Sequence, residues 1–480
     1  MNPLQLERSS KQPLTEQLAG QLSERITQGL LAPGSRLLSV RECARRHGIS
    51  PSTVVAAYDQ LLARGLVEAR KQRGFFVRPP GPRRAAPQLA PLSPAVQPLD
   101  ATALIRSMFE HGGRPAPGLG TLPATWLDGV MLQSALRKAL NSSSADSVVD
   151  YGDPLGDAGL REALSQRLAE LGIVAAPKQI LTTVGATQAL DLVTRALLRP
   201  GDAVLVDDPG WAVEYARLSQ AGMQLLPVPR GAQGPDLAVM EQLIAQHRPR
   251  LYATVSVLHN PTGSSISLSQ AHQLLKLAEA ADLMIVEDDT YAAFAPPHLP
   301  RLAALDGLQR TIYISGFSKM LSPGWRVGFL AAPPQWQERL VDMKLLSTLT
   351  TPAWLERAVA HCLRQGLLRR HAERVLAQLE AARERTVKLA LAHGVRFVTP
   401  PAGLFGWVDV GVDSERLGQR LREEGWLCAP GSLFSPQREA GSLMRINFAS
   451  SQDAAFWKAL VRCRETLLRS GSVAARLSGC

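Results

Sequence analysis

The segment from 315 to 329, SGFSKMLSPGWRVGF, decides how we interpret the larger part of this sequence. Lys319 follows a short apolar stretch that is typical of a strand, and Ser318 directly precedes it. Arg326 stands seven positions further along the chain. A lysine amine can form a Schiff base, while a nearby hydroxyl and guanidinium can hold a phosphate group. The segment therefore suits a Schiff-base nitrogen beside a phosphate site.

Apolar strands alternate with amphipathic helices around this segment. The predicted strands are 179–184, 203–208, 251–257, 283–288, 311–315 and 326–332. Such alternation is typical of a mostly parallel sheet with helices on both faces. From about residue 390 onward, shorter strands and two helices predict a smaller α+β domain.

Residues suited to binding an aromatic ligand follow the carboxyl ends of these strands, where open α/β sheets bind ligands. Asp288 could keep a pyridine nitrogen protonated, and Tyr291 and Asn260 could hydrogen-bond an oxygen on the ring. Trp211 offers a flat face for stacking. Taken singly, Trp211 could be a packed aromatic, Asn260 a turn residue and Asp288 a strand-end cap. Their joint occurrence in this order favours a cofactor site.

This set of residues resembles that of the fold-type I pyridoxal-phosphate aminotransferases, over about residues 118 to 470. The resemblance implies that Lys319 is the catalytic Schiff-base lysine and that Arg445 grips a substrate or effector carboxylate. It implies that Tyr151 is lent to the phosphate of a neighbouring subunit. The implied cofactor-binding residues are Lys319, Asp288, Tyr291, Asn260, Trp211, Ala186, Thr187, Ser318, Arg326 and Tyr151.

Three neighbours of these residues, Gly316, Ser315 and His259, do not belong to this set. Three positions before the lysine the family usually places Ser or Thr on the phosphate, and this chain has Gly316. Ser315 stands one position away, which leaves open whether it substitutes. His259 we interpret as structural.

The N-terminal part differs from the rest in charge and in pattern. Residues 1–84 hold fourteen basic residues against six acidic ones, which is a net +8 of the whole chain's +11. Such asymmetry indicates a polyanionic partner, although a basic surface alone would serve solubility equally well. Three helical patterns and two short β segments follow one another before residue 79, with Ser50 a plausible N-cap. This order predicts a winged helix-turn-helix.

Basic and hydroxyl side chains stand where such a domain meets DNA. The predicted DNA-binding residues are Arg41, Arg45, Arg46, Ser50, Ser52, Thr53, Arg70, Lys71 and Arg73. The segment resembles the GntR family of bacterial regulators and departs from its pattern at Leu38 and Cys43. The alternative is an ordinary three-helix domain with surface arginines.

The chain as a whole resembles the MocR subfamily of bacterial transcription regulators. We expect a winged-helix domain at 1–78, a Pro-rich linker and lead-in at 79–117, a large domain at 118–388, and a small domain with a poorly ordered tail at 389–480. The resemblance implies a domain-swapped homodimer that binds operator DNA and senses pyridoxal phosphate with or without an amino compound. A working aminotransferase with a DNA-binding appendage is the alternative, and the sequence does not discriminate between them.

The composition indicates in which cellular compartment we expect the protein. The five cysteines are scattered without a C-x-x-C pair, which fits a reducing cytoplasm and predicts no metal site. No leader-like or membrane-spanning apolar run occurs, so we expect neither export nor membrane insertion.

Overall fold

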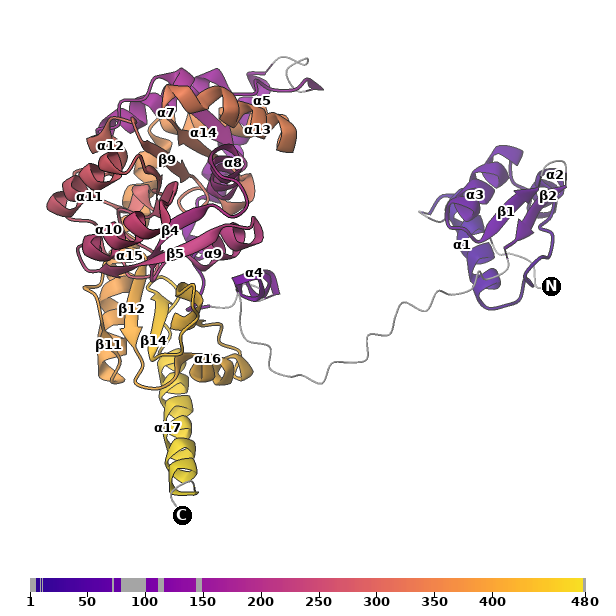
Figure 1. Ribbon diagram of the computed structural model, residues 1–480. Helices are drawn as coiled ribbons and strands as arrows, with labels where there is room; N and C mark the ends of the chain where they lie inside the picture. The colour runs from indigo at the N-terminus through magenta and orange to yellow at the C-terminus, as the bar shows by residue number, and fades with distance from the viewer. Residues whose placement is uncertain are drawn as a thin grey trace. The chain divides into compact units, whose positions relative to one another are not determined.

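The computed structural model describes residues 6–8, 10, 12–70, 73–78, 101–110, 116–143 and 149–477. Contacts divide the chain into two compact units, Met1–Ala95 and Val96–Cys480, which are drawn in Figure 1 and described separately. Of the predicted Pro-rich linker and lead-in at 79–117, residues 79–100 and 111–115 lie outside the described residues, and so do the last three residues of the predicted tail.

The first unit is a winged helix-turn-helix, as predicted. Its elements are α1 (Leu14–Thr27), α2 (Val40–His47), α3 (Pro51–Ala63) and the antiparallel strands β1 (Val67–Arg70) and β2 (Gly74–Val77). The side chain of Ser50 caps α3 by accepting a hydrogen bond from the N–H of Thr53 at 3.1 Å. Gly48 ends α2 with a φ of 63°, which allows the sharp turn between the two helices. Cys43 lies in the core of this unit, so the departure there concerns packing.

The second unit is built on an eight-stranded sheet with the order β3-β10-β9-β8-β7-β4-β5-β6. Its strands are β3 (Ile180–Thr183), β4 (Ala203–Asp208), β5 (Gln224–Gly231), β6 (Gly234–Pro235), β7 (Leu251–Thr254), β8 (Met284–Asp288), β9 (Thr311–Gly316) and β10 (Gly328–Ala331). The pairs from β5 to β9 are parallel, and β10 runs antiparallel to both of its neighbours. The mostly parallel sheet is confirmed. The expected strands omitted β5, whose two prolines, Pro227 and Pro229, interrupt its apolar pattern.

Helices cover both faces of this sheet (Figure 1). One face carries α8 (Ala186–Leu197), α9 (Ala212–Gln220) and α13 (Gln337–Thr348), and the other carries α10 (Leu237–His247), α11 (Leu268–Ala280) and α12 (Leu302–Asp306). Successive residues of a strand point to opposite faces, so Val206 packs with the first group and Leu205 with the second. Burial on both faces explains the nearly continuous apolar strands of the sequence.

A smaller antiparallel sheet follows, with the order β11-β12-β14-β13. Its strands are β11 (Arg396–Phe397), β12 (Phe405–Asp409), β13 (Ala429–Pro430) and β14 (Leu443–Asn447). The remaining helices are α4 (Ala101–Glu110), α5 (Gly129–Asn141), α7 (Ala158–Glu170), α14 (Ala353–Arg364), α15 (Leu367–Ala392), α16 (Ser414–Glu423) and α17 (Ala454–Leu477), and 3-10 helices span 124–126, 177–179, 292–294, 323–325, 334–336 and 431–434. One continuous core joins this smaller sheet to the large one.

Membrane-spanning helices and clusters of metal ligands are both absent from the described residues. Across the ranges given above, no helix is long and apolar enough to span a membrane. Nor do the described residues gather three or more metal-ligating side chains of the His, Cys, Asp or Glu type. Cys43, Cys362, Cys428 and Cys463 are buried free thiols.

Candidate functional site

The candidate cofactor residues lie at the carboxyl edge of the large sheet. Lys319 follows β9, Asp288 ends β8, Asn260 lies in the turn after β7, and Trp211 stands between β4 and α9. These four strands are neighbours and parallel, so their carboxyl ends meet at one edge. The sheet therefore brings together residues that are more than a hundred positions apart in the chain.

The amine of Lys319 lies in a desolvated, positively charged setting. Its Nζ donates a hydrogen bond to the carbonyl of Gly120 at 2.7 Å. Burial lowers the pKa of Lys319 to about 8, and the nearby Arg445 guanidinium acts in the same direction, while Asp288 opposes it. At pH 7 roughly a tenth of this amine is therefore neutral, and so nucleophilic, which is far more than for an ordinary lysine.

Asp288 and Tyr291 are held by local structure at the end of β8. The Oδ1 of Asp288 accepts a hydrogen bond from the N–H of Thr290 at 2.9 Å, and burial raises the pKa of Asp288 to about 6. Trp211 and Asp288 line the same cavity. The ring of Tyr291 packs edge-on against Phe405, with centroids 5.4 Å apart, and burial raises its pKa.

Arg445 extends from β14 into the same region and is 4% exposed. Its Nη1 donates to Oδ1 of Asn260 at 2.8 Å, and its Nη2 donates to the carbonyl of Gly118 at 2.5 Å. The rings of Phe405 and Phe434 lie 4.5 Å and 4.9 Å from the guanidinium carbon. Its Nε has no hydrogen-bond partner among the described residues, although it is buried. A buried donor without a partner is costly, and an anionic ligand would satisfy it.

Glycines open a cradle at the start of α8. A Cβ on Gly328 would lie 2.6 Å from the carbonyl carbon of Gly185 and 2.7 Å from the nitrogen of Ala186. A Cβ on Gly185 would lie 2.5 Å from Nη2 of Arg326. Arg326 itself donates to Oγ of Ser318 at 3.1 Å and to the carbonyl of Val184 at 3.1 Å. Free N–H groups of α8 and a guanidinium thus converge where an anion such as phosphate would fit.

Gly316 borders this cradle without supplying a hydroxyl. A Cβ at this position would lie 3.6 Å from the nitrogen of Ala186. The hydroxyl of Ser315 instead donates to the carbonyl of Asp289 at 2.8 Å. Since neighbouring strand residues point to opposite faces, Ser315 does not substitute for the hydroxyl that Gly316 lacks.

Three further residues complete the comparison with the sequence. Thr187 is exposed in the first turn of α8. Tyr151 is 80% exposed, and no hydrogen bond or ring contact joins it to the other candidates within the described part of one chain. His259 is buried, its Nδ1 lies 2.9 Å from Oγ1 of Thr262, and burial lowers its pKa to about 4. These contacts suit the structural interpretation of His259.

Several contributors to this site were not predicted from the sequence. The carbonyls of Gly118 and Gly120 accept from Arg445 and Lys319, and the rings of Phe405 and Phe434 cover the guanidinium of Arg445. Gly118 packs so closely on Cys428 that a Cβ would lie 2.4 Å from the backbone carbon of Cys428. The glycine pair of the PGLG segment, 117–120, was the one available signal, because glycine often marks a close approach of two backbones.

The candidate DNA-binding residues occupy adjacent parts of the winged-helix unit. Arg41, Arg45 and Arg46 are exposed on α2. Around the start of α3, Oγ of Ser50 lies 2.7 Å from the hydroxyls of both Ser52 and Thr53. In the hairpin, Arg70 pairs with Glu68 at 2.7 Å, and Arg73 is exposed. Lys71 lies outside the described residues.

Comparison with known proteins supports both halves of this architecture. Residues 14–77 match the model for bacterial regulatory proteins of the gntR family, and residues 125–462 match the model for aminotransferases of class I and II. The chain is 31% identical to the HTH-type transcriptional regulator TauR of Rhodobacter capsulatus, over 95% of this chain and 96% of that protein. The chain belongs to the MocR subfamily of GntR-type transcription regulators.

Two other similarities extend this assignment. The MocR-type chain is 29% identical to the probable rhizopine catabolism regulatory protein MocR of Rhizobium meliloti, over 82% of this chain and 81% of that one. Its body is similar to the crystal structure of LysN, the alpha-aminoadipate aminotransferase of Thermus thermophilus, with a TM-score of 0.70, 28% identity, and coverage of 76% of this chain and 95% of that chain. This MocR-type protein is therefore a helix-turn-helix transcription regulator with an aminotransferase-like domain.

Proposed function

We propose that this regulator binds pyridoxal phosphate at Lys319 and senses an amino compound through Arg445. One observation carries the proposal: an amine and a partly unsatisfied guanidinium lie beside the same glycine, Gly120. A Cβ on Gly120 would lie 3.7 Å from Nζ of Lys319 and 3.9 Å from Nη1 of Arg445. A small molecule with an amino group and an anionic group could therefore engage both positions. A sulfonate would satisfy Arg445 as well as a carboxylate.

The residues around Lys319 fit the cofactor that the resemblance implies. Bound pyridoxal phosphate would supply an aldehyde that condenses reversibly with primary amines, and a ring that withdraws electrons. Asp288 would hold the proton on the ring nitrogen, and Trp211 would stack on the ring. Asn260 and Tyr291 would bind the ring oxygen. The phosphate would lie in the glycine cradle, held by Ala186, Thr187, Ser318 and Arg326.

Helix α4 offers a route from this site toward the DNA-binding unit, because α4 follows the linker in the chain. Ala101 and Leu104 pack against a cluster that includes Trp407 and Phe434. Phe434 contacts the Arg445 guanidinium through its ring, and its carbonyl accepts from the N–H of Gly210 at 2.8 Å. A ligand that draws the guanidinium away from Phe434 alters the surface on which α4 rests. Differential contacts of this kind bias one state of the body over another.

Replacing Leu104 with alanine tests this route. We expect the variant to bind the cofactor and the amino compound as the unmodified protein does. The amino compound should, however, change the free energy of DNA binding by at most half as much as in the unmodified protein. Phe109→Ala on the same helix is the matched control, because Phe109 is 78% exposed. Fluorescence anisotropy of a labelled duplex measures the affinity. Equal responses in the two variants would show that α4 does not transmit the signal.

The pH dependence of cofactor capture follows from the lowered pKa of Lys319, about 8. The neutral amine is the reactive form, so its fraction rises as pH increases through the pKa and levels off above it. We expect the rate of visible band formation to rise between about pH 7 and pH 9 and then to become constant. Stopped-flow absorption across this range measures it. A rate that continues to rise toward the ordinary lysine pKa would contradict the desolvated setting of Lys319.

The DNA-binding half is tested through salt dependence. Arg45 is exposed on α2, where we place a phosphate contact. Arg45→Ala should weaken binding to all sequences and reduce the slope of log affinity against log salt by about one. Arg369→Ala on α15 is the control, since its side chain is 79% exposed in the other unit. If the slope of log affinity against log salt is the same for Arg45→Ala and Arg369→Ala, Arg45 does not contact the DNA backbone.

The proposed function as a whole is tested by DNA affinity in the presence of ligands. Operator duplexes are first selected from a random-sequence pool by the protein itself. Their affinity is then measured for the apo protein, after addition of pyridoxal phosphate, and after further addition of single amino carboxylates or of 2-aminoethanesulfonate. We expect at least one amino compound to change the affinity only when the cofactor is present. DNA affinity that is indifferent to cofactor and to every amino compound would refute the sensor.

A working aminotransferase is the second candidate function. Two observations favour it: Lys319, Asp288 and Arg445 are all present, and the body is similar to LysN. Half-reaction kinetics with a panel of amino acids separates the two functions. Sustained formation of keto acid supports the enzyme, whereas a spectral change without keto acid supports the sensor.

We further propose a homodimer in which Tyr151 completes the phosphate site of the partner subunit, in keeping with the exposure of its side chain. We propose that this homodimer is domain-swapped. We also propose that the protein is located in the cytoplasm. Sedimentation of the holoprotein tests the dimer. Tyr151→Phe should weaken cofactor binding without dissociating the dimer.

A further inference from the structure

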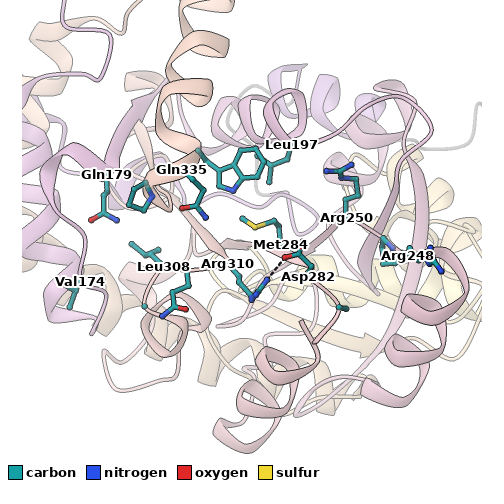
Figure 2. A pocket seen from close by; sticks show the side chains of 16 residues that line it. Val174, Gln179, Leu197, Arg248, Arg250, Asp282, Met284, Leu308, Arg310 and Gln335 are labelled. Atoms are coloured by element: carbon teal, nitrogen blue, oxygen red, sulfur yellow. Dashed lines mark hydrogen bonds and ion pairs between the residues drawn. The ribbon is translucent and has the colours of Figure 1, made fainter. Parts of the chain in front are cut away.

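A large cavity lies at the opposite edge of the main sheet from Lys319. Its volume is about 920 Å³, and Figure 2 shows it from close by. Arg250 directly precedes β7, Met284 begins β8, and Arg310 directly precedes β9. These three residues mark the amino ends of strands whose carboxyl ends carry the candidate cofactor residues. The cavity is therefore separate from the Lys319 site.

The walls of this cavity combine apolar surface with positive charge. Leu197, Met284, Leu308 and Trp336 supply the apolar part. Three arginines supply the charge, and Figure 2 shows them spread around Met284: Arg248, Arg250 and Arg310. A flat apolar ligand body with an anionic group would match this combination.

Only part of this charge is compensated within the described residues. Nη1 of Arg310 donates to Oδ1 of Asp282 at 3.0 Å, and the side chain of Asp282 is 98% exposed. For the side chains of Arg248 and Arg250, no hydrogen bond or ion pair occurs within the part of the chain that the structure describes. Asp282 is the single acidic residue among the lining residues.

Helix ends offer a simpler explanation for the arginines, and it is incomplete. The helices α10, α11 and α12 all end at this cavity, and helix C-termini favour nearby cations. That effect accounts for positive charge at the rim. It does not account for the hollow itself, in which Leu197, Met284, Leu308 and Trp336 stand beside the arginines.

We propose that this cavity binds a small aromatic or heteroaromatic compound that carries a carboxylate, phosphate or sulfonate group. Its volume lies within the range of small-molecule sites, roughly 300–1,000 Å³. The guanidiniums of Arg248 and Arg250 bind the anionic group, and the ring lies against Trp336 and its apolar neighbours. The site is independent of the cofactor, so it persists in the Lys319→Ala protein.

Anilinonaphthalene sulfonate is a suitable probe, because it is an aromatic anion whose fluorescence increases in apolar surroundings. We titrate it into the full-length protein and into two charge-reversal variants, Arg250→Glu and Arg369→Glu. Both arginines are exposed, and only Arg250 lines the cavity. We expect the affinity to fall at least tenfold in Arg250→Glu and to stay unchanged in Arg369→Glu. Inorganic pyrophosphate should displace the probe from the unmodified protein.

A second variant separates the cavity from a merely basic surface. Trp336→Phe should reduce energy transfer from tryptophan to the bound probe. Its melting temperature should equal that of the control variant, Arg369→Glu. Equal probe affinity in Arg250→Glu and Arg369→Glu would overturn the proposal, because the probe would then bind elsewhere, for example at Arg445. Displacement by a DNA duplex but not by pyrophosphate would overturn it too, because the arginines would then contact a nucleic-acid backbone.

Discussion

Replacing Lys319 with alanine is expected to abolish the visible absorption band that the protein develops with pyridoxal phosphate, while the affinity for DNA without effector stays unchanged. The reason is that the band requires a lysine amine at the carboxyl edge of the sheet, whereas the winged-helix unit has its own core. The same variant should no longer change its DNA affinity when an amino compound is added. Absorption spectra and anisotropy titrations of the two proteins measure both effects.

The matched control is a second buried lysine. Lys344 is fully buried, donates to Oγ1 of Thr182 at 3.3 Å, and burial lowers its pKa to about 8, as for Lys319. Lys344→Met should keep the band, because Lys344 lies on α13 and contacts Thr182 and Thr351 and does not line the cavity of Asp288 and Trp211. A band that persists in Lys319→Ala would disprove the assignment. If even the unmodified protein shows no band, the body does not bind the cofactor, because Gly316 lacks the hydroxyl that would hold the phosphate. Only the DNA-binding part of the proposed function would then remain.

Gly328→Ala is expected to have the second large effect, on both stability and cofactor binding. The added Cβ would meet backbone atoms of Gly185 and Ala186 at 2.6 Å and 2.7 Å, and backbone cannot move aside as a flexible side chain can. Overpacking of this kind costs about 1–3 kcal/mol. It also displaces the start of α8, which forms one wall of the cradle. We expect a lower melting temperature and at least a tenfold loss of cofactor affinity.

Gly324→Ala provides the comparison in the same segment. A Cβ there would meet only Oγ of Ser322, at 3.7 Å, so the substitution should leave both stability and cofactor affinity unchanged. Differential scanning fluorimetry and absorption titration measure the two quantities. If Gly328→Ala binds the cofactor as Gly324→Ala does, the cradle at α8 is not the phosphate site.

Local patterns in the sequence were sufficient for the elements that depend on neighbouring residues. The cap of α3 by Ser50 and the hairpin of the wing follow from short-range hydrogen bonding and turn chemistry. The strand that ends at Asp288 and the strand that precedes Lys319 could be predicted, because burial on both faces makes them nearly continuous apolar runs. Since the carboxyl ends of adjacent parallel strands share an edge, the order of strands and polar residues along the chain was enough to group the candidate residues.

Other features depend on contacts between distant segments, which no local pattern specifies. The neighbours of Arg445 come from 118, 260, 405 and 434. Phe405 reaches it through the pairing of β12 with β14 inside the small sheet, whereas Asn260 reaches it because the small sheet packs against the large one. The packing of α4 on Phe434, the direction of β10 and the cavity beside Arg250 have the same origin. The sequence by itself determined the two kinds of domain and the residues at the strand ends, because these depend on periodicity and turns. Only the tertiary structure decided what surrounds each charge, because burial and unsatisfied hydrogen bonds arise when segments hundreds of residues apart are packed together.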